Sequence, residues 1–236
     1  MIGVLAREPV EAAQFVDALM VQARDGKRPP GPRSRPHEDG YGVAVYSGGH
    51  WIHIREQCPM WVGALDASRR LCGTVMLLHA RLASPDLRID LTKTHPFAAA
   101  TNGSTLMFCH NGTIRAAERL PVACPDHATD TERYFALVLE RVKAKQGLSD
   151  ALLATAEMIY STVGEDAVSV NALLTDGREL VAYRGRITPQ NMNYHTLFVA
   201  ESPALRVVST EPFDLPGAGD WRGMAPQEIV VWRADA

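Results

Sequence analysis

Two amphipathic segments that follow one another near the middle of the chain constrain its fold more than any other feature. The first starts at Thr129-Asp130-Thr131-Glu132, which offers an N-cap candidate, and continues as an apolar stripe with helical spacing. The second covers about residues 149–163 after a short joint at Gly147. Strand-like segments precede and follow this pair. Strands, two helices and strands again predict stacked sheets with helices on the outside.

The strand-like segments cover most of the remaining chain. Before the helices they cover residues 1–6, 43–46, 51–54 and 74–84, and a further strand starts at 107 and breaks at Asn111-Gly112; after them they cover residues 169–174, 179–184, 196–200, 205–210 and 228–232. Helical spacing occurs at 10–25 and 61–71. Gly48-Gly49 and Asp176-Gly177 indicate hairpin turns. A loop at 26–36 with four prolines is basic; we expect it to be solvated, and a lid, a phosphate site or a partner contact is the alternative. We predict one domain over residues 1–236.

Composition is that of a globular protein and excludes several functions. Hydrophobic residues make up 46% and charged residues 22%, and the net charge is −3, so there is no electrostatic case for nucleic acid or an anionic membrane. Four widely spaced cysteines match no zinc motif, and we predict no metal and no cofactor. Free thiols favour the cytoplasm. No run is long enough to span a bilayer, and charged residues near the start argue against a signal peptide.

Candidate site residues stand where predicted strands end. We expect the chain to turn at Asn111-Gly112, so that the Asn111 amide and the Gly112 N–H point at one spot, as in an oxyanion hole; an ordinary turn is the alternative. His79 and Arg81 share one strand face. Arg81 suits a ligand carboxylate or a salt bridge, and the spacing does not choose between them. Asp130 is either a helix cap or an anchor for an ammonium group.

These groups together describe a site for one class of ligand. Arg81 suits an α-carboxylate, Asp130 suits an α-ammonium group, and Asn111 with Gly112 suits a developing oxyanion. The set fits an amino acid with a hydrolysable side-chain carbonyl, such as glutamine.

Five motifs, in order, resemble those of the class II glutamine amidotransferases. They are His-Glu-Asp-Gly-Tyr-Gly at 37–42, His-Ala-Arg-Leu-Ala-Ser at 79–84, Thr-His-Pro-Phe at 94–97, Cys-His-Asn-Gly-Thr-Ile at 109–114 and Thr-Asp-Thr-Glu at 129–132. The similarity continues at 173–178 and is strongest to the short, stand-alone members of the family. It implies an α+β fold of the N-terminal-nucleophile hydrolase type, a four-layer αββα sandwich of two mainly antiparallel sheets. Carried over residue by residue, it implies an oxyanion hole at Asn111 and Gly112 and a substrate-binding set of Arg81, Asp130, His79 and His95.

The chain departs from the family at the nucleophile. That residue is an N-terminal cysteine, exposed when the initiator Met is removed, and its own α-amino group serves as the base. Here Ile2 occupies the nucleophile position, and Ile has no nucleophilic atom. Because Ile is bulky, we expect Met1 to stay in place. Losing a catalytic nucleophile costs on the order of 10⁶ in rate, so we expect no biologically useful hydrolysis.

Three functional hypotheses follow from these observations. The first is a glutamine amidotransferase-like protein that no longer hydrolyses glutamine. It would bind glutamine or a similar amino acid as a ligand-binding, regulatory or scaffold subunit, with a partner enzyme or as a homo-oligomer. The alternative is an active glutaminase that supplies ammonia to a partner enzyme through an unorthodox nucleophile, for which Cys109 is the candidate. The third is a sandwich kept only for assembly.

Overall fold

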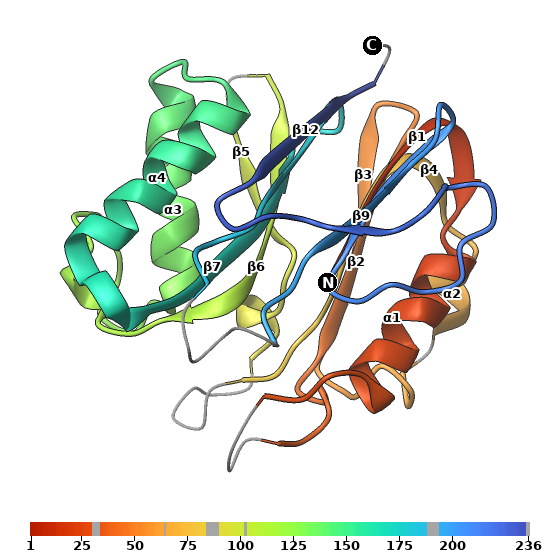
Figure 1. Ribbon diagram of the computed structural model, residues 1–236, viewed down its shortest axis with the longest axis horizontal. Helices are drawn as coiled ribbons and strands as arrows, with labels where there is room; N and C mark the ends of the chain where they lie inside the picture. The colour runs from red at the N-terminus through yellow and green to blue at the C-terminus, as the bar shows by residue number, and fades with distance from the viewer. Residues whose placement is uncertain (30–33, 64, 84–89, 102, 188–193, 235–236) are drawn as a thin grey trace.

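The computed structural model describes residues 1–29, 34–63, 65–83, 90–101, 103–187 and 194–234. Two antiparallel sheets lie face to face and helices cover their outer faces, so the chain forms four layers (Figure 1). This confirms the predicted αββα sandwich. Residues 30–33 of the predicted basic loop lie outside the described residues. No helix in the described part of the chain is long and apolar enough to cross a membrane.

Within the described residues, the larger sheet has seven strands in the order β11-β9-β10-β1-β4-β2-β3. Their bounds are β1 Ile2–Glu11, β2 Tyr41–Ser47, β3 His50–Glu56, β4 Cys72–Ala80, β9 Phe198–Glu201, β10 Leu205–Ser209 and β11 Arg222–Gly223. Helices α1 (Ala13–Asp25) and α2 (Leu65–Arg69) pack on its outer face. Gly48 and Gly49 turn β2 into β3 with positive φ angles, as predicted.

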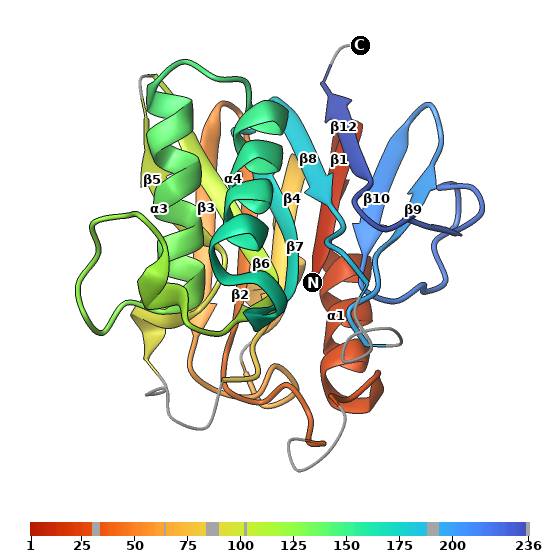
Figure 2. The same ribbon diagram turned by 60° about the vertical axis from the view of Figure 1, so that its left-hand side comes forward.

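The smaller sheet has the order β12-β8-β7-β6-β5. Its strands are β5 Phe97–Ala100, β6 Thr105–Ile114, β7 Ala167–Thr175, β8 Glu179–Tyr183 and β12 Ile229–Arg233. Helices α3 (Asp130–Lys143) and α4 (Leu148–Val163) cover its outer face (Figure 2). Short 3-10 turns lie at η2 Leu91–Lys93, η3 Ala117–Arg119 and η4 Gly164–Asp166.

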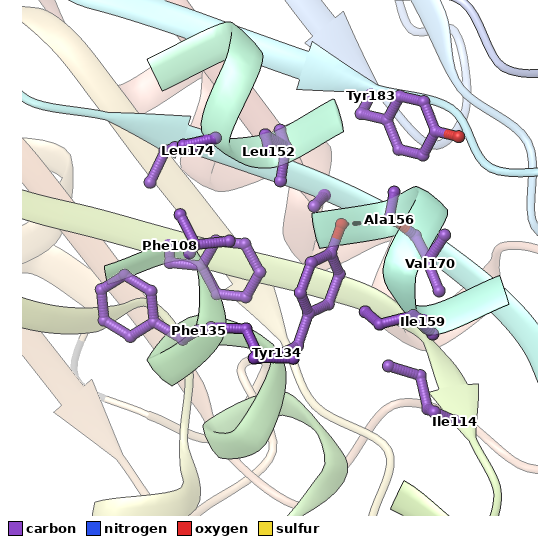
Figure 3. Packing of buried hydrophobic residues seen from close by; sticks show 14 of the residues in the cluster. Phe108, Ile114, Tyr134, Phe135, Leu152, Ala156, Ile159, Val170, Leu174 and Tyr183 are labelled. Carbon is purple, nitrogen blue, oxygen red and sulfur yellow. Dashed lines mark hydrogen bonds between the residues drawn. The ribbon is translucent and has the colours of Figure 1, made fainter. Parts of the chain in front are cut away.

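Aromatic side chains join these helices to the smaller sheet. The ring of Phe108 on β6 stacks on that of Phe135 on α3, with centroids 5.0 Å apart. Tyr134, also on α3, donates from its hydroxyl to the carbonyl of Val170 on β7 at 3.4 Å (Figure 3). A second apolar layer, which contains Cys109, fills the space between the two sheets.

The first turn of α3 forms as its sequence predicts. The Thr129 hydroxyl accepts from the Glu132 N–H at 3.1 Å, and the Glu132 carboxylate accepts from the Thr129 N–H at 2.7 Å. This reciprocal capping box satisfies two helix-end donors. It also fixes the position of Asp130, the first residue of the helix.

The predicted turn at Asn111-Gly112 is wrong. Both residues remain in β6, and Asn111 lies directly opposite Asn171 on β7. A Cβ on Gly112 would lie 2.0 Å from the carbonyl oxygen of Ser169. Glycine is therefore needed here because the neighbouring strand comes very close, not because the chain reverses.

Several element boundaries also differ from prediction; the second predicted helix, for example, covers Leu65–Arg69 rather than 61–71. The first helix begins at Ala13 rather than near residue 10, because β1 continues to Glu11 and pairs again with β4 after a register shift. Strand β4 ends at Ala80, so Arg81 follows the strand, and Ser84 of the predicted strand lies outside the described residues.

Candidate functional site

A polar cavity of about 150 Å³ lies where the ends of β4 and β6 meet the start of α3. Segments 194–195 and 210–211 complete its wall. All six residues predicted to surround a ligand line this cavity: Arg81, Asp130, Asn111, Gly112, His79 and His95. Because β4 and β6 belong to different sheets, only the stacking of the sheets brings these side chains together.

Arg81 is a buried cation that has no acidic partner among the residues that the structure describes. Its side chain is 5% exposed, and no carboxylate in the described part of the chain forms an ion pair with it. Nη1 has no hydrogen-bond partner among the described residues. Burial lowers the pKa of the guanidinium, although Asp39 and Asp130 lie close enough to oppose that effect.

Asp39, which lies close to Arg81, and the cation Lys93 in the cavity wall are paired with other groups. Asp39 accepts from Arg35 Nη2 at 2.6 Å and from the backbone N–H of Ala83 at 2.7 Å. Lys93, which also lines the cavity, forms an ion pair of 2.6 Å with Glu132. The salt bridge that the sequence left open for Arg81 is therefore absent among the described residues.

Asp130 connects the end of β6 to the start of α3. Its Oδ2 accepts from the Ile114 N–H at 2.9 Å, and its Oδ1 accepts from the Thr131 N–H at 2.8 Å. Thr129 is the N-cap, so Asp130 does not have to act as the cap. A carboxylate offers roughly four acceptor positions, so Asp130 keeps capacity for a donor in the cavity.

The Asn111 side chain lines the cavity. Its Oδ1 lies 3.3 Å from Nδ1 of His195. Its Nδ2 has no hydrogen-bond partner in the part of the chain that the structure describes. Sequence reasoning missed His195, and its neighbour Tyr194, because no spacing or motif links residues 194–195 to a strand that lies more than eighty positions earlier.

His79 and His95 connect the larger sheet to the segment that precedes β5. Nε2 of His79 lies 3.3 Å from Nδ1 of His95, and the rings meet edge to face at 4.4 Å. Burial lowers the pKa of both imidazoles well below the usual range, so both are neutral near pH 7. Nδ1 of His79 has no partner among the described residues.

Met1 and Ile2, the residues at the start of β1, point to opposite sides of the larger sheet. Ile2 is completely buried with Val4 and Phe15 in the core beneath α1, and it does not line the cavity. Met1 lines the cavity, and its α-amino nitrogen donates to the Thr210 hydroxyl at 3.2 Å. Burial lowers the pKa of this amine to about 5.

None of the four cysteine thiols lines the cavity. All four cysteines are free and lie within the described residues. Cys109 is fully buried between the sheets, and burial raises the pKa of its thiol far above the usual range. Within the described residues, no group of three or more His, Cys, Asp or Glu side chains is arranged to hold a metal ion.

Comparison with known proteins decides the family. The model of the class II glutamine amidotransferases matches residues 20–195, which is most of the chain. The chain belongs to this family. It is 28% identical over 233 residues to an uncharacterized protein of Methanocaldococcus jannaschii, covering 85% of this chain and 62% of that protein. It is 25% identical over 158 residues to the putative glutamine amidotransferase YafJ of Escherichia coli, covering 63% and 61%. The chain thus spans about three fifths of the length of these relatives.

Solved structures share the fold of this family member at low sequence identity. A predicted glutamine amidotransferase of Pseudomonas aeruginosa superimposes with a TM-score of 0.62 at 20% identity, covering 100% of this chain and 97% of that one. Glutamine phosphoribosylpyrophosphate amidotransferase of Bacillus subtilis gives a TM-score of 0.70 at 18% identity, covering 98% of this chain and 46% of that one. The fold is therefore the N-terminal-nucleophile hydrolase type expected from the sequence.

Proposed function

We propose that this chain binds glutamine, or a closely similar α-amino acid, in the cavity between its sheets and does not hydrolyse it through a cysteine. One observation carries the proposal: Arg81 is a buried guanidinium without an acidic partner in the described part of the chain, and it lines the same cavity as Asp130. Burying an unpaired charge is costly, and a ligand carboxylate on Arg81 would offset that cost.

The remaining polar groups fit the other parts of such a ligand. The open acceptor positions of Asp130 suit an α-ammonium group, and Nδ2 of Asn111 suits the side-chain carbonyl. The cavity volume of about 150 Å³ is below the roughly 300–1,000 Å³ of pockets for drug-sized ligands. It therefore suits a molecule of amino-acid size.

The proposal that hydrolysis is lost rests on the nucleophile. Ile2 supplies hydrocarbon where the family pattern has cysteine, and Cys109 is sealed in the core with a raised pKa. In this reading the protein acts in the cytoplasm as a ligand-binding, regulatory or scaffold subunit. It does so beside a partner enzyme or in a homo-oligomer.

Calorimetry and an ammonia assay test the two parts separately. We expect wild-type protein to bind glutamine and not 4-aminobutyramide, which lacks the α-carboxylate. Arg81→Lys should weaken binding about tenfold or more, because Lys cannot form the bidentate pair. Arg206→Lys, on β10 and outside the cavity lining, is the matched control.

Either part can fail alone. Absence of binding heat with both glutamine and glutamate, in protein with a folded circular dichroism spectrum, would refute ligand binding. Release of glutamate and ammonia from glutamine by wild-type protein would refute the loss of hydrolysis. If that activity disappears in Cys109→Ala, the buried thiol is the nucleophile after all.

A further inference from the structure

A side-chain amide can present either of two chemistries to a cavity. Its nitrogen donates hydrogen bonds and its oxygen accepts them, and a rotation of 180° exchanges the two with little change in shape. For Asn111, this choice decides whether the cavity offers a donor or an acceptor to a ligand carbonyl. The group that holds the other end of the amide therefore controls what the cavity recognises.

His195 holds that other end. Its Nδ1 is 3.3 Å from Oδ1 of Asn111, across 84 positions of the sequence. If Nδ1 carries the proton, it donates to Oδ1, and Nδ2 of Asn111 must face the cavity. If Nδ1 is bare, the amide turns to donate to it and Oδ1 faces the cavity instead.

The backbone of His195 is fixed by the residue opposite Asn111. Asn171 on β7, which is buried, donates from Nδ2 to the His195 carbonyl at 3.1 Å. Its Oδ1 accepts from the Gly185 N–H at 2.8 Å. Because Asn171 pairs with Asn111 in the sheet register, this bond holds His195 beside the Asn111 amide that it contacts.

A second chain of contacts reaches His195 from the larger sheet. Burial lowers the pKa of His37 to about 4, so its ring is neutral at pH 7. Its Nδ1 lies 3.2 Å from the Ala80 carbonyl, which only accepts, so Nδ1 donates and Nε2 is bare. Nε2 therefore accepts from the Tyr194 hydroxyl at 2.8 Å, and the Tyr194 ring packs edge-on against His195 at 4.7 Å. His37, Tyr194, His195 and Asn111 all line the cavity.

We infer that His195 is a positioning residue: its Nδ1–H fixes the Asn111 amide so that Nδ2 points at the side-chain carbonyl of the bound amino acid. The inference deepens the proposed function and rests on it for the identity of the ligand. It also gives a role to His37, the first residue of the motif at 37–42, which the proposed contacts to the amino-acid backbone do not use.

Variants of His195 separate positioning from general structural support. His195→Leu removes the donor, whereas His195→Asn can place an amide N–H where Nδ1 stood. We expect His195→Leu to weaken glutamine binding about threefold to tenfold, the effect of one hydrogen bond, and His195→Asn to restore most of the loss. In an Asn111→Ala background, His195→Leu should cause no further loss. Equal losses in both backgrounds would overturn the inference.

A measurement on the ligand-free protein keeps the inference testable by itself. Long-range ¹⁵N–¹H correlation spectra report which nitrogen of each histidine ring is protonated, and loss of signals in His195→Asn assigns His195. We expect a protonated Nδ1, and a shift of the Asn111 side-chain NH₂ resonances in His195→Leu. A bare Nδ1, or unchanged NH₂ resonances, would overturn the inference. Failure to bind glutamine would instead refute the proposed function.

Discussion

Replacing Arg81 by Met should stabilise the ligand-free protein and abolish glutamine binding. Met is unbranched and fills the space of the arginine stem without bringing a charge or a donor. In the structure the guanidinium is 5% exposed and Nη1 has no partner among the described residues. Removing the whole polar group therefore removes a cost of burial and, in the described part of the chain, leaves behind no acid that depended on it for an ion pair.

The size of the effect follows from that unpartnered nitrogen. Leaving a buried donor unsatisfied costs about 1–3 kcal/mol. For a domain of this size, each kcal/mol changes Tm by roughly 2–4 °C. We therefore expect Arg81→Met to raise Tm by about 5 °C and to raise the free energy of unfolding by about 2 kcal/mol.

Thermal melts and urea titrations of ligand-free protein measure this change. Arg133→Met is the matched control, because Arg133 is 7% exposed but donates from Nη2 to the Pro125 carbonyl at 3.2 Å. That variant should be neutral or less stable than wild type. A fall in Tm for Arg81→Met, or glutamine binding that survives the change, would refute the view that Arg81 is kept for a ligand.

Two further predictions concern stability. Burial lowers the pKa of His37 and His53 to about 4, whereas unfolded histidine titrates near roughly 6.5. Between these values the unfolded chain binds more protons, so these histidines should make stability fall as pH drops from about 6.5 towards 4. The buried Met1 amine, whose pKa is lowered from 8.0 to about 5, should add a decline that starts near pH 8. Melting curves at a series of pH values should show Tm falling with pH. His53→Gln should make this decline shallower, whereas His127→Gln, at an exposed position, should leave it unchanged. A Tm that stays constant down to pH 5 would contradict the prediction. Gly112→Ala should lower the free energy of unfolding in urea titrations by about 3 kcal/mol, because the new methyl group would meet a backbone carbonyl that cannot move aside. Gly223→Ala is the control, because a Cβ there meets nothing closer than 3.8 Å. Similar stabilities of the two variants would show that β7 can shift to make room for the methyl group.

Local signals in the sequence were enough to predict several elements. The start of α3 depends on contacts between residues three apart, and the turn at Gly48-Gly49 depends on two residues with positive φ. The two-helix block between groups of strands also predicted the four layers, because an amphipathic face has to be covered. Motif order identified the family, and the residues of those motifs do line one cavity.

Other properties of the site depended on partners far away in the sequence. Asn111 stays in a strand, against the turn preference of Asn-Gly, because β7 pairs with it along its length. Among the described residues Arg81 has no ion-pair partner, because Arg35 and a backbone N–H already occupy Asp39. The contact between Asn111 and His195 joins residues 84 positions apart, and no local sequence pattern predicts it.

The sequence by itself thus determined which elements form, which family the chain resembles and which polar groups are available for a ligand. Only the tertiary structure decided which of those groups remain unpaired and which way they point. The physical reason is that backbone preference and capping act within a few residues, whereas charge pairing, burial and amide orientation depend on neighbours that two stacked sheets bring together.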